Sequence, residues 1–238
     1  MTERTLVAIP AFNEARSVGL VVEEALAHGH NVLVVDDGST DTTADVARAG
    51  GARVIRLPIN LGVGGARRCA YRFAVEHGYS SVVDCDADGQ HPVAQIHNLI
   101  RIADELALDL LVGSRFVSTD AQLIEQRRLR RVAMWTLARS ASRATGSIIT
   151  DSTSGFRVVR EPLLSVFAKR LPSYYLGDTY EAIVAAGRAG YRIGETAVEM
   201  NERWYGESTA SARQAARFVL RAFLTGTLHL HEHLPRRP

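Results

Sequence analysis

The sequence predicts an α/β fold, in which a mostly parallel β-sheet carries helices on both of its faces. Short apolar runs alternate with segments of helical periodicity, which is typical of this class. Polar loops follow the first, second and fourth apolar runs, at residues 10–14, 36–41 and 84–90. Because ligands bind outside the carboxyl ends of strands in open parallel sheets, these loops are expected to share one site.

Five apolar runs in the first half of the chain are expected to be buried strands. They are residues 5–9, 31–35, 52–57, 81–84 and 110–113. The helices expected between them are residues 15–27, a helix that reaches Ala49, residues 64–76, and a helix from Pro92 to Leu106. Ser39 or Thr40 is expected to cap the second of these helices.

The pattern changes after about residue 117, where arginine becomes frequent. Residues 123–144 predict a long arginine-rich helix, and residues 155–159 predict a strand. A helix at 178–189, a strand at 191–200 and a terminal helix at 211–230 complete the expected elements. We interpret this as a change of role within one domain, because no linker separates the two halves.

Length and composition are those of a single α/β domain: 238 residues, 46% of them hydrophobic, with a formal net charge of +2. A nearly balanced charge argues against a nucleic-acid partner. Cys69 and Cys85 have neither metal-site spacing nor a disulfide framework, which fits a reducing cytosol. Neither a signal peptide nor an uncharged apolar run of about eighteen residues is expected. The expected location is the cytoplasm, with peripheral attachment to the inner face of the membrane left open.

The most informative string is Asp84-Cys85-Asp86-Ala87-Asp88-Gly89-Gln90-His91-Pro92, which follows an apolar run. Acidic residues stand at alternate positions, so an extended segment would place their carboxylates on one face. With no cation inside the string, such a cluster is expected either to be solvated or to hold a divalent metal ion. Mg²⁺ or Mn²⁺ takes one or two carboxylates and completes its shell with water and phosphate oxygens. A metal-bound diphosphate such as a nucleotide-sugar is the expected ligand, and a solvated acidic turn is the alternative.

Two other strand-ending loops carry groups that suit a nucleoside. In residues 10–14, Glu14 can accept hydrogen bonds from a base or ribose, and Phe12 offers an apolar wall. An acid of the 36–41 loop can accept from ribose hydroxyls or a base N–H. The glycine-rich turn of a dinucleotide fingerprint is missing after the first strand. Ordinary helix capping, by Asn13 for example, is the alternative for both loops.

Arginines gather in the chain from the fifth expected strand onward. Arg115 follows the fifth strand and can grip a phosphate through paired hydrogen bonds. A basic segment holds four more arginines, at positions 127, 128, 130 and 131. Arg203 lies in an aromatic loop, and the terminal helix has an arginine stripe at 213, 217 and 221. The expected partner is an acceptor phosphate or an anionic membrane surface, and a solvated basic face is the alternative.

Five strings stand in order along the chain. They are Pro10-Ala11-Phe12-Asn13-Glu14, Val35-Asp36-Asp37-Gly38-Ser39-Thr40-Asp41, Asp86-Ala87-Asp88-Gly89-Gln90-His91-Pro92, Gly113-Ser114-Arg115-Phe116 and Thr153-Ser154-Gly155-Phe156-Arg157. Together they resemble glycosyltransferase family 2, and most closely its dolichol-phosphate mannosyltransferases and their bacterial polyprenyl-phosphate relatives. The resemblance covers about residues 5–210, and five motifs in order are far more specific than any one of them.

The resemblance implies a GT-A fold, which is Rossmann-like, with residues 1–118 as the nucleotide-sugar-binding half and 119–210 as the acceptor-side half; residues 211–238 would be a basic C-terminal helix and tail. It implies an inverting transfer of a hexose from GDP-mannose or UDP-glucose to a polyprenyl phosphate, with Mg²⁺ or Mn²⁺. Contact with a membrane surface or with a membrane partner subunit is left open, because many relatives carry C-terminal transmembrane helices.

By position, the family motifs also imply residue roles. The nucleoside would contact Pro10, Phe12, Glu14 and Asp37, with Asp86 on nucleotide or metal. Asp88 and Gln90 would hold metal and diphosphate, and Arg115, Arg127 and Arg203 the phosphates. Arg131 stands where the family often has serine, four residues after Arg127, so the geometry of the acceptor phosphate differs there.

The acceptor decides whether a base is required. A phosphate is largely dianionic at neutral pH and needs positioning only. A hydroxyl of a soluble or glycan acceptor needs a carboxylate base, for which Asp178 and Glu181 are the candidates. A binding protein without turnover and a nucleotidyltransferase remain as alternatives. The acidic cluster with its arginines disfavours the first, and the missing basic glycine-rich loop disfavours the second.

Overall fold

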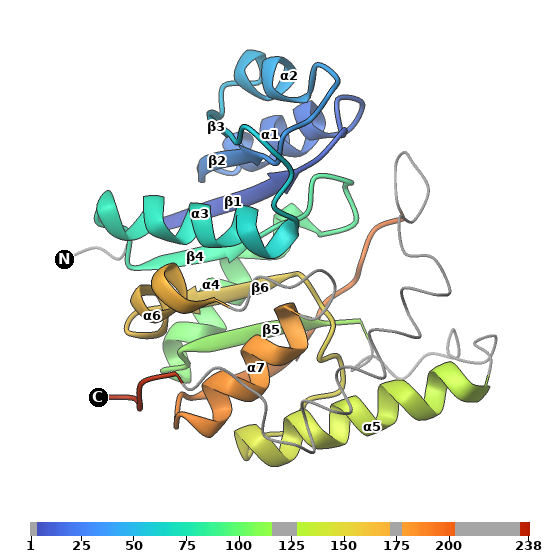
Figure 1. Ribbon diagram of the computed structural model, residues 1–238, viewed down its shortest axis with the longest axis vertical. Coiled ribbons are helices and arrows are strands. Elements are labelled where there is room, and N and C mark those ends of the chain that lie inside the picture. The colour runs from blue at the N-terminus through green and yellow to red at the C-terminus, as the bar shows by residue number, and fades with distance from the viewer. Residues whose placement is uncertain (1–3, 116–127, 172–177, 203–233) are drawn as a thin grey trace.

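A computed structural model describes residues 4–115, 128–171, 178–202 and 234–238 of the chain (Figure 1). Its centre is a seven-stranded sheet in the order β3-β2-β1-β4-β6-β5-β7. The strands are β1 (Thr5–Ala11), β2 (Asn31–Asp36), β3 (Arg53–Arg56), β4 (Ser81–Asp84), β5 (Leu110–Ser114), β6 (Arg157–Arg160) and β7 (Ile193–Ala197). β6 runs antiparallel to both of its neighbours, β4 and β5, and the other strand pairs are parallel. The prediction of a mostly parallel sheet is confirmed.

Helices cover both faces of this sheet, as expected for strands that are apolar on each side (Figure 1). One apolar cluster packs α3, α5, α6 and α7 on one face, and a second cluster packs α1, α2 and α4 on the other. The helices are α1 (Val18–Ala27), α2 (Thr43–Ala49), α3 (Val63–Glu76), α4 (Ile96–Glu105), α5 (Arg128–Thr145), α6 (Leu163–Arg170) and α7 (Asp178–Arg188). A short 3-10 turn, Val93–Gln95, precedes α4.

The expected strands are all present within a few residues of their predicted bounds. Helix α6 was missed, because its apolar residues form a run too short to separate helix from strand by periodicity. The predicted cap of α2 is wrong: the helix begins at Thr43, and its flanking residue Thr42 makes no side-chain capping bond. The terminal helix expected at 211–230 lies outside the described residues.

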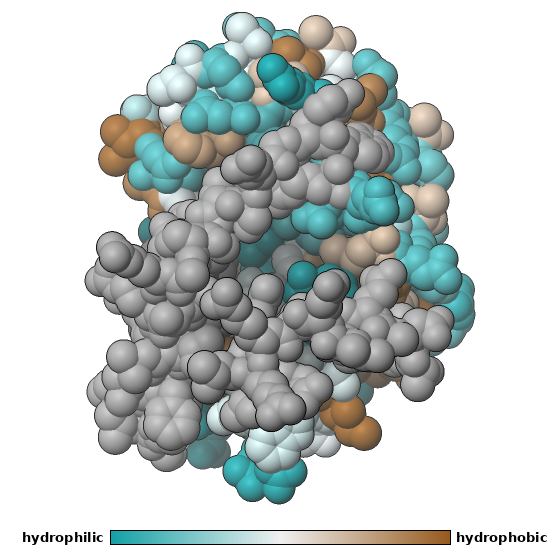
Figure 2. Space-filling model, turned by 90° about the vertical axis from the view of Figure 1, so that its right-hand side faces the viewer, coloured by the Kyte–Doolittle hydropathy of each residue, from teal (hydrophilic) through white to brown (hydrophobic). Residues whose placement is uncertain are grey.

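The carboxyl ends of the parallel strands meet at one edge of the sheet, so the loops after β1, β2 and β4 emerge together. Figure 2 looks onto that side of the molecule, and the part of the described surface visible near its centre is hydrophilic. The fold therefore brings the predicted polar loops to one place.

Candidate active site

The loops after β1 and β2 are joined by hydrogen bonds into one wall. The Asn13 N–H donates to the Ser39 Oγ, and the Thr40 N–H donates to the Asn13 Oδ1, each over 2.9 Å. The Asp37 N–H donates to the carbonyl of Ala11 over 2.8 Å. Asn13 has a positive φ of 56° and Ser39 accepts from the neighbouring loop, so these side chains link loops and do not cap helices. Pro10, Phe12 and Glu14 belong to this wall.

Asp37 holds the loop between β3 and α3 against this wall. Its Oδ1 accepts the Leu61 N–H over 2.7 Å, and burial raises the pKa of its carboxyl. Gly38, with φ of 75°, lets that loop approach, since a Cβ there would lie 2.8 Å from the Ile59 carbonyl carbon. Phe12 is 44% exposed, so it offers an open apolar face beside this polar framework.

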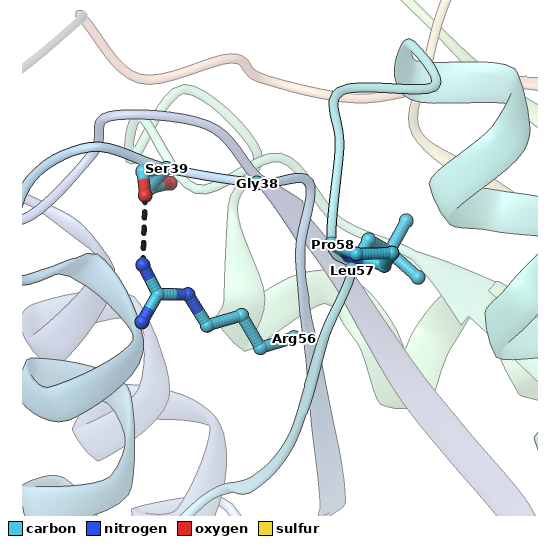
Figure 3. Close-up of a pocket in the computed structure, with 5 residues that line it drawn as sticks. All are labelled: Gly38, Ser39, Arg56, Leu57 and Pro58. Carbon is cyan, nitrogen blue, oxygen red and sulfur yellow. Dashed lines mark hydrogen bonds between the residues drawn. The ribbon is translucent and has the colours of Figure 1, made fainter.

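A cavity of about 370 Å³ opens at the ends of β2 and β3 (Figure 3). It is lined by Gly38, Ser39, Arg56, Leu57 and Pro58. The Arg56 guanidinium donates to the Ser39 carbonyl over 3.0 Å, and its Nε lies 3.4 Å from the Oδ2 of the buried Asp36. The cavity has the size and mixed polarity of a small-molecule pocket. It adjoins the predicted nucleoside loops, but Pro10, Phe12 and Glu14 do not line it.

The acidic string divides into one structural carboxylate and two at the site. Asp84, the last residue of β4, is fully buried, and its Oδ2 accepts from the Tyr71 hydroxyl and from the Arg157 Nε at 2.7 Å. The string itself holds no cation, as the sequence shows, but the expectation of a cluster either solvated or metal-bound does not fit Asp84, which two arginines neutralise. The cations come from elsewhere in the chain: Arg157 from β6 and Arg67 from α3, both fully or almost fully buried.

Asp86 is the exposed member, with 38% of its side chain accessible. Its Oδ1 accepts from the Arg67 Nη2 at 3.3 Å, and its Oδ2 lies 3.5 Å from the His91 Nε2. The Asp86 backbone N–H donates to the His91 Nδ1 over 2.8 Å, so the ring proton sits on Nε2, facing the carboxylate. Burial lowers the pKa of His91, which keeps its ring neutral and acting as a hydrogen-bond donor.

The loop that follows is pinned on both sides. The Oδ1 of Asp88, which is only 6% exposed, accepts the Gln90 N–H over 3.0 Å. Asn201 holds the loop from outside: its N–H donates to the Gln90 carbonyl over 2.9 Å and its Nδ2 to the Gly89 carbonyl over 3.2 Å. The backbone that carries the predicted metal ligands is thus fixed by its own contacts.

The donor set suits Mg²⁺ or Mn²⁺ held jointly with a diphosphate. Asp86, Asp88 and Gln90 offer carboxylate and amide oxygens, which these hard cations prefer. Within residues 4–115, 128–171, 178–202 and 234–238, no three histidine, cysteine or acidic side chains form a ready metal cage. Mg²⁺ commonly uses one or two carboxylates and takes its remaining ligands from water and substrate phosphates.

Arg115 follows β5 and is held ready by an acidic partner. Its Nε and Nη2 donate to the two oxygens of Asp151 at 2.8 and 3.0 Å, and Nη2 also reaches the Thr153 Oγ1 at 3.1 Å. Asp151 is fully buried, while 42% of the Arg115 side chain is exposed. Asp151 thereby fixes the guanidinium through its Nε and Nη2 and leaves part of the Arg115 side chain exposed.

The other predicted site residues divide into three groups. Arg127 and Arg203 lie outside the described residues. Arg131 and Asp178 are placed by their backbone only, in the first turns of α5 and α7. Glu181, also in the first turn of α7, is 5% exposed and therefore buried.

Several residues of the site were not predicted from the sequence, namely Arg67, His91, Asp151, Arg157 and Glu195. Glu195 of β7 accepts the backbone N–H groups of Thr150 and Asp151 and so anchors the segment that holds Arg115. Arg67, Asp151 and Glu195 act across long sequence separations, which no local spacing announces. His91 and Arg157 had a signal, because they stand inside the acidic string and at the end of the fifth family string, but the sequence assigned them no role.

Comparisons with known proteins identify the family of this chain. The family model described as glycosyl transferase family 2 matches residues 6–167. Undecaprenyl-phosphate mannosyltransferase of Micrococcus luteus is 31% identical over 87% of this chain and 88% of its own. Polyprenol monophosphomannose synthase of Mycolicibacterium smegmatis is 32% identical over 88% of this chain and 82% of its own.

Among solved structures, glucosyl-3-phosphoglycerate synthase from Mycobacterium tuberculosis, in complex with Mn²⁺, UDP and phosphoglyceric acid, superposes with a TM-score of 0.71. That match covers 94% of this chain and 78% of the other at 18% identity, so it concerns the fold, which is GT-A. The segment matched by the family model, residues 6–167, includes β1, β2, β4 and β5 with the loops of the candidate site. The chain is therefore a glycosyltransferase and belongs to glycosyl transferase family 2.

Proposed function

We propose that this enzyme transfers a hexose, with mannose as the first candidate, from a nucleotide-sugar to a polyprenyl phosphate, with inversion and with Mg²⁺ or Mn²⁺. The observation that carries the proposal is the pinned loop bearing Asp86, Asp88 and Gln90 at the carboxyl edge of the sheet. Two relatives, the undecaprenyl-phosphate mannosyltransferase and the polyprenol monophosphomannose synthase, support the same acceptor and sugar.

On the donor side, the joined loops after β1 and β2 would receive the nucleoside. Asp37 and Glu14 supply carboxylates for ribose or base, and Phe12 supplies an apolar face. The diphosphate would lie toward Asp88 and Gln90, where a bound divalent cation would offset the charge that builds on the leaving group. Because the Leu61 N–H already fixes the Asp37 carboxylate, binding of the donor would cost little conformational entropy at this residue.

On the acceptor side, an incoming phosphate would be positioned by Arg115, with Arg127, Arg131 and Arg203 as the further proposed contacts. A phosphate monoester is largely dianionic near neutral pH, so its oxygen can attack without a general base. The Asp151 partner keeps the Arg115 fork oriented before the acceptor arrives, which lowers the entropy lost on binding.

A hydroxyl acceptor is the second candidate, favoured by one observation. Glu181, buried in the first turn of α7, is a carboxylate that a phosphate acceptor would not need as a base. Asp178 stands in the same turn and is the other candidate base. Under this alternative an Asp178→Asn or Glu181→Gln variant would lose most of its turnover, whereas with a phosphate acceptor neither carboxylate is needed for proton transfer.

We also propose peripheral contact with the membrane that holds the lipid. No helix in the described ranges is long and apolar enough to cross a bilayer. On α5, Trp135 is 62% exposed and the Arg139 guanidinium lies 5.6 Å from its ring centre. A tryptophan beside a cation suits the headgroup region of an anionic leaflet.

The acceptor is best tested with two lipids that differ only in the phosphate. Radiolabelled GDP-mannose or UDP-glucose is offered with Mn²⁺ to a short-chain polyprenyl phosphate or to the matching polyprenol. We expect label in the lipid fraction with the polyprenyl phosphate and none with the polyprenol. Equal transfer to the polyprenol, or transfer only to soluble glycans, would establish the hydroxyl alternative instead.

A further inference from the structure

A buried guanidinium lies beneath the acidic loop and has no part in the function proposed so far. Arg67 stands in the second turn of α3, and 3% of its side chain is exposed. Its Nη2 donates to the Asp86 Oδ1 at 3.3 Å, and its Nη1 to the Thr179 Oγ1 at 3.4 Å. Its Nε lies 3.7 Å from the Asp84 Oδ2. One side chain thus reaches three segments that are far apart in the sequence.

The charge of Arg67 serves Asp86 more than Asp84. Asp84 already has the Arg157 Nε at 2.7 Å and the Tyr71 hydroxyl on the same oxygen. Its contact with Arg67 is the longer of the two, 3.7 Å against 3.3 Å for Asp86. Since attraction weakens with distance and with competing partners, Arg67 interacts more strongly with Asp86 than with Asp84, and within the described ranges it is a buried cation in direct contact with Asp86.

The loop before β6 is shaped around this ion pair. A Cβ at Gly155 would lie 2.7 Å from the Arg67 Nη2 and 3.1 Å from the Asp86 Oδ2. Both distances are shorter than carbon makes with such atoms without displacement. Glycine at 155 therefore leaves the space in which the guanidinium meets the carboxylate.

The second arm of Arg67 ends on the acceptor side. Thr179 is 6% exposed and lies in the first turn of α7, next to Asp178 and two residues before Glu181. Arg67 thereby joins the loop that would hold the donor diphosphate to the start of α7, a helix within the acceptor-side half. A guanidinium can make both contacts at once because its donors form a rigid fork.

We propose that Arg67 is a positioning residue that fixes Asp86 relative to the first turn of α7. Its positive charge also offsets the charge of Asp86 until the metal ion and the diphosphate bind together. This inference rests on the proposed donor site. The charge and the geometry of Arg67 make separate contributions, so two substitutions distinguish them. Arg67→Gln removes the charge, and Arg67→Lys keeps it but replaces the fork by a single ammonium.

The first readout is the binding of Mn²⁺ in the absence of donor and acceptor. Binding is measured as the loss of the electron paramagnetic resonance signal of the free ion. Arg67→Gln removes the positive charge beside Asp86, so the electrostatic potential at that carboxylate becomes more negative. Mn²⁺ alone is therefore expected to bind about tenfold more tightly. Arg67→Lys is expected to bind Mn²⁺ as the parent chain does. Arg72→Gln is the matched control, because Arg72 is an exposed arginine of the same helix.

The second readout is turnover with donor and acceptor. Both Arg67 variants are expected to lose about 10- to 100-fold in kcat, as partners of metal ligands commonly do. Thr179→Val cuts only the second arm and is expected to lower kcat several-fold with Mn²⁺ binding unchanged. Tighter metal binding with slower turnover is a combination that general loss of structure does not produce.

Unchanged Mn²⁺ binding or weaker binding in Arg67→Gln would overturn the charge role, and unchanged kcat in Arg67→Lys and Thr179→Val would overturn the positioning role. If circular dichroism shows that Arg67→Gln does not fold, the other two variants decide the matter. Absence of Mn²⁺ binding in the parent chain, with and without donor, would refute the metal site and this inference together. Normal Mn²⁺ effects without sugar transfer would refute the proposed acceptor alone.

Discussion

At the residue scale, neighbouring carboxylates of one motif have different duties. Asp84 is enclosed by Tyr71 and Arg157, whereas Asp86 and Asp88 lie on the pinned loop that follows. The alternate spacing in the sequence predicted a single acidic face. It could not predict the split, because the cations that capture Asp84 come from α3 and β6.

Asp84→Asn is expected to weaken folding by about 3–5 kcal/mol, because it leaves the buried Arg157 without its anionic partner. Asp88→Asn is expected to leave the free energy of unfolding within about 1 kcal/mol of the parent value while lowering kcat at least about 100-fold. Urea unfolding and initial-rate assays on both variants measure the contrast. Equal losses of stability in the two would contradict the division of roles.

At the scale of single elements, the start of β2 and helix α4 carry a histidine pair unrelated to the site. The rings of His30 and His97 lie 4.3 Å apart, and the His30 Nε2 is buried without a hydrogen-bond partner in the described structure. Burial, with His97 and His28 adding repulsion, lowers the pKa of His30 to about 4. The folded chain therefore resists protonation of this ring.

A depressed histidine pKa makes stability depend on pH in a definite direction. Above about pH 6.5 the ring is neutral in both states and the stability is complete. Between about 6.5 and 4 the unfolded chain takes up the proton first, so stability falls as pH falls. Allowing for partial exposure, His30→Gln is expected to reduce the loss between pH 7 and 5 by about 1 kcal/mol. Urea unfolding at both pH values tests this, with the exposed His77→Gln as control; identical pH slopes would contradict it.

Helix α5 gives the second prediction at this scale. If Trp135 enters the lipid headgroups, Trp135→Ala is expected to weaken binding to anionic vesicles by about three- to tenfold, through loss of buried apolar area. Leu106→Ala is the matched control: both side chains are 62% exposed, and Leu106 lies at the end of α4 that leads into β5. Sedimentation with phosphatidylglycerol vesicles measures the difference, and an equal effect of the two substitutions would exclude a specific role for α5.

At the scale of the whole molecule, the sequence predicts the α/β class well, because the apolar runs are short, frequent and ended by turn residues. The same pattern places the site, since the carboxyl ends of parallel strands share an edge. It could not reveal that β6 lies antiparallel between β4 and β5, because strand order depends on long-range pairing. For the same reason the sequence did not reveal that Asp151 pairs with Arg115, or that Glu195 holds the backbone of Asp151.

The proposed role of the acidic loop, to bind the metal and diphosphate during sugar transfer to a lipid phosphate, is tested by transfer of radiolabelled mannose from GDP-mannose to a short-chain polyprenyl phosphate, with UDP-glucose run in parallel. The measurement is made on the parent chain and on Asp88→Asn, with Mn²⁺ and with chelator. We expect label in the lipid fraction for the parent chain only, and its loss with chelator. Transfer that survives both Asp88→Asn and chelation would refute this role.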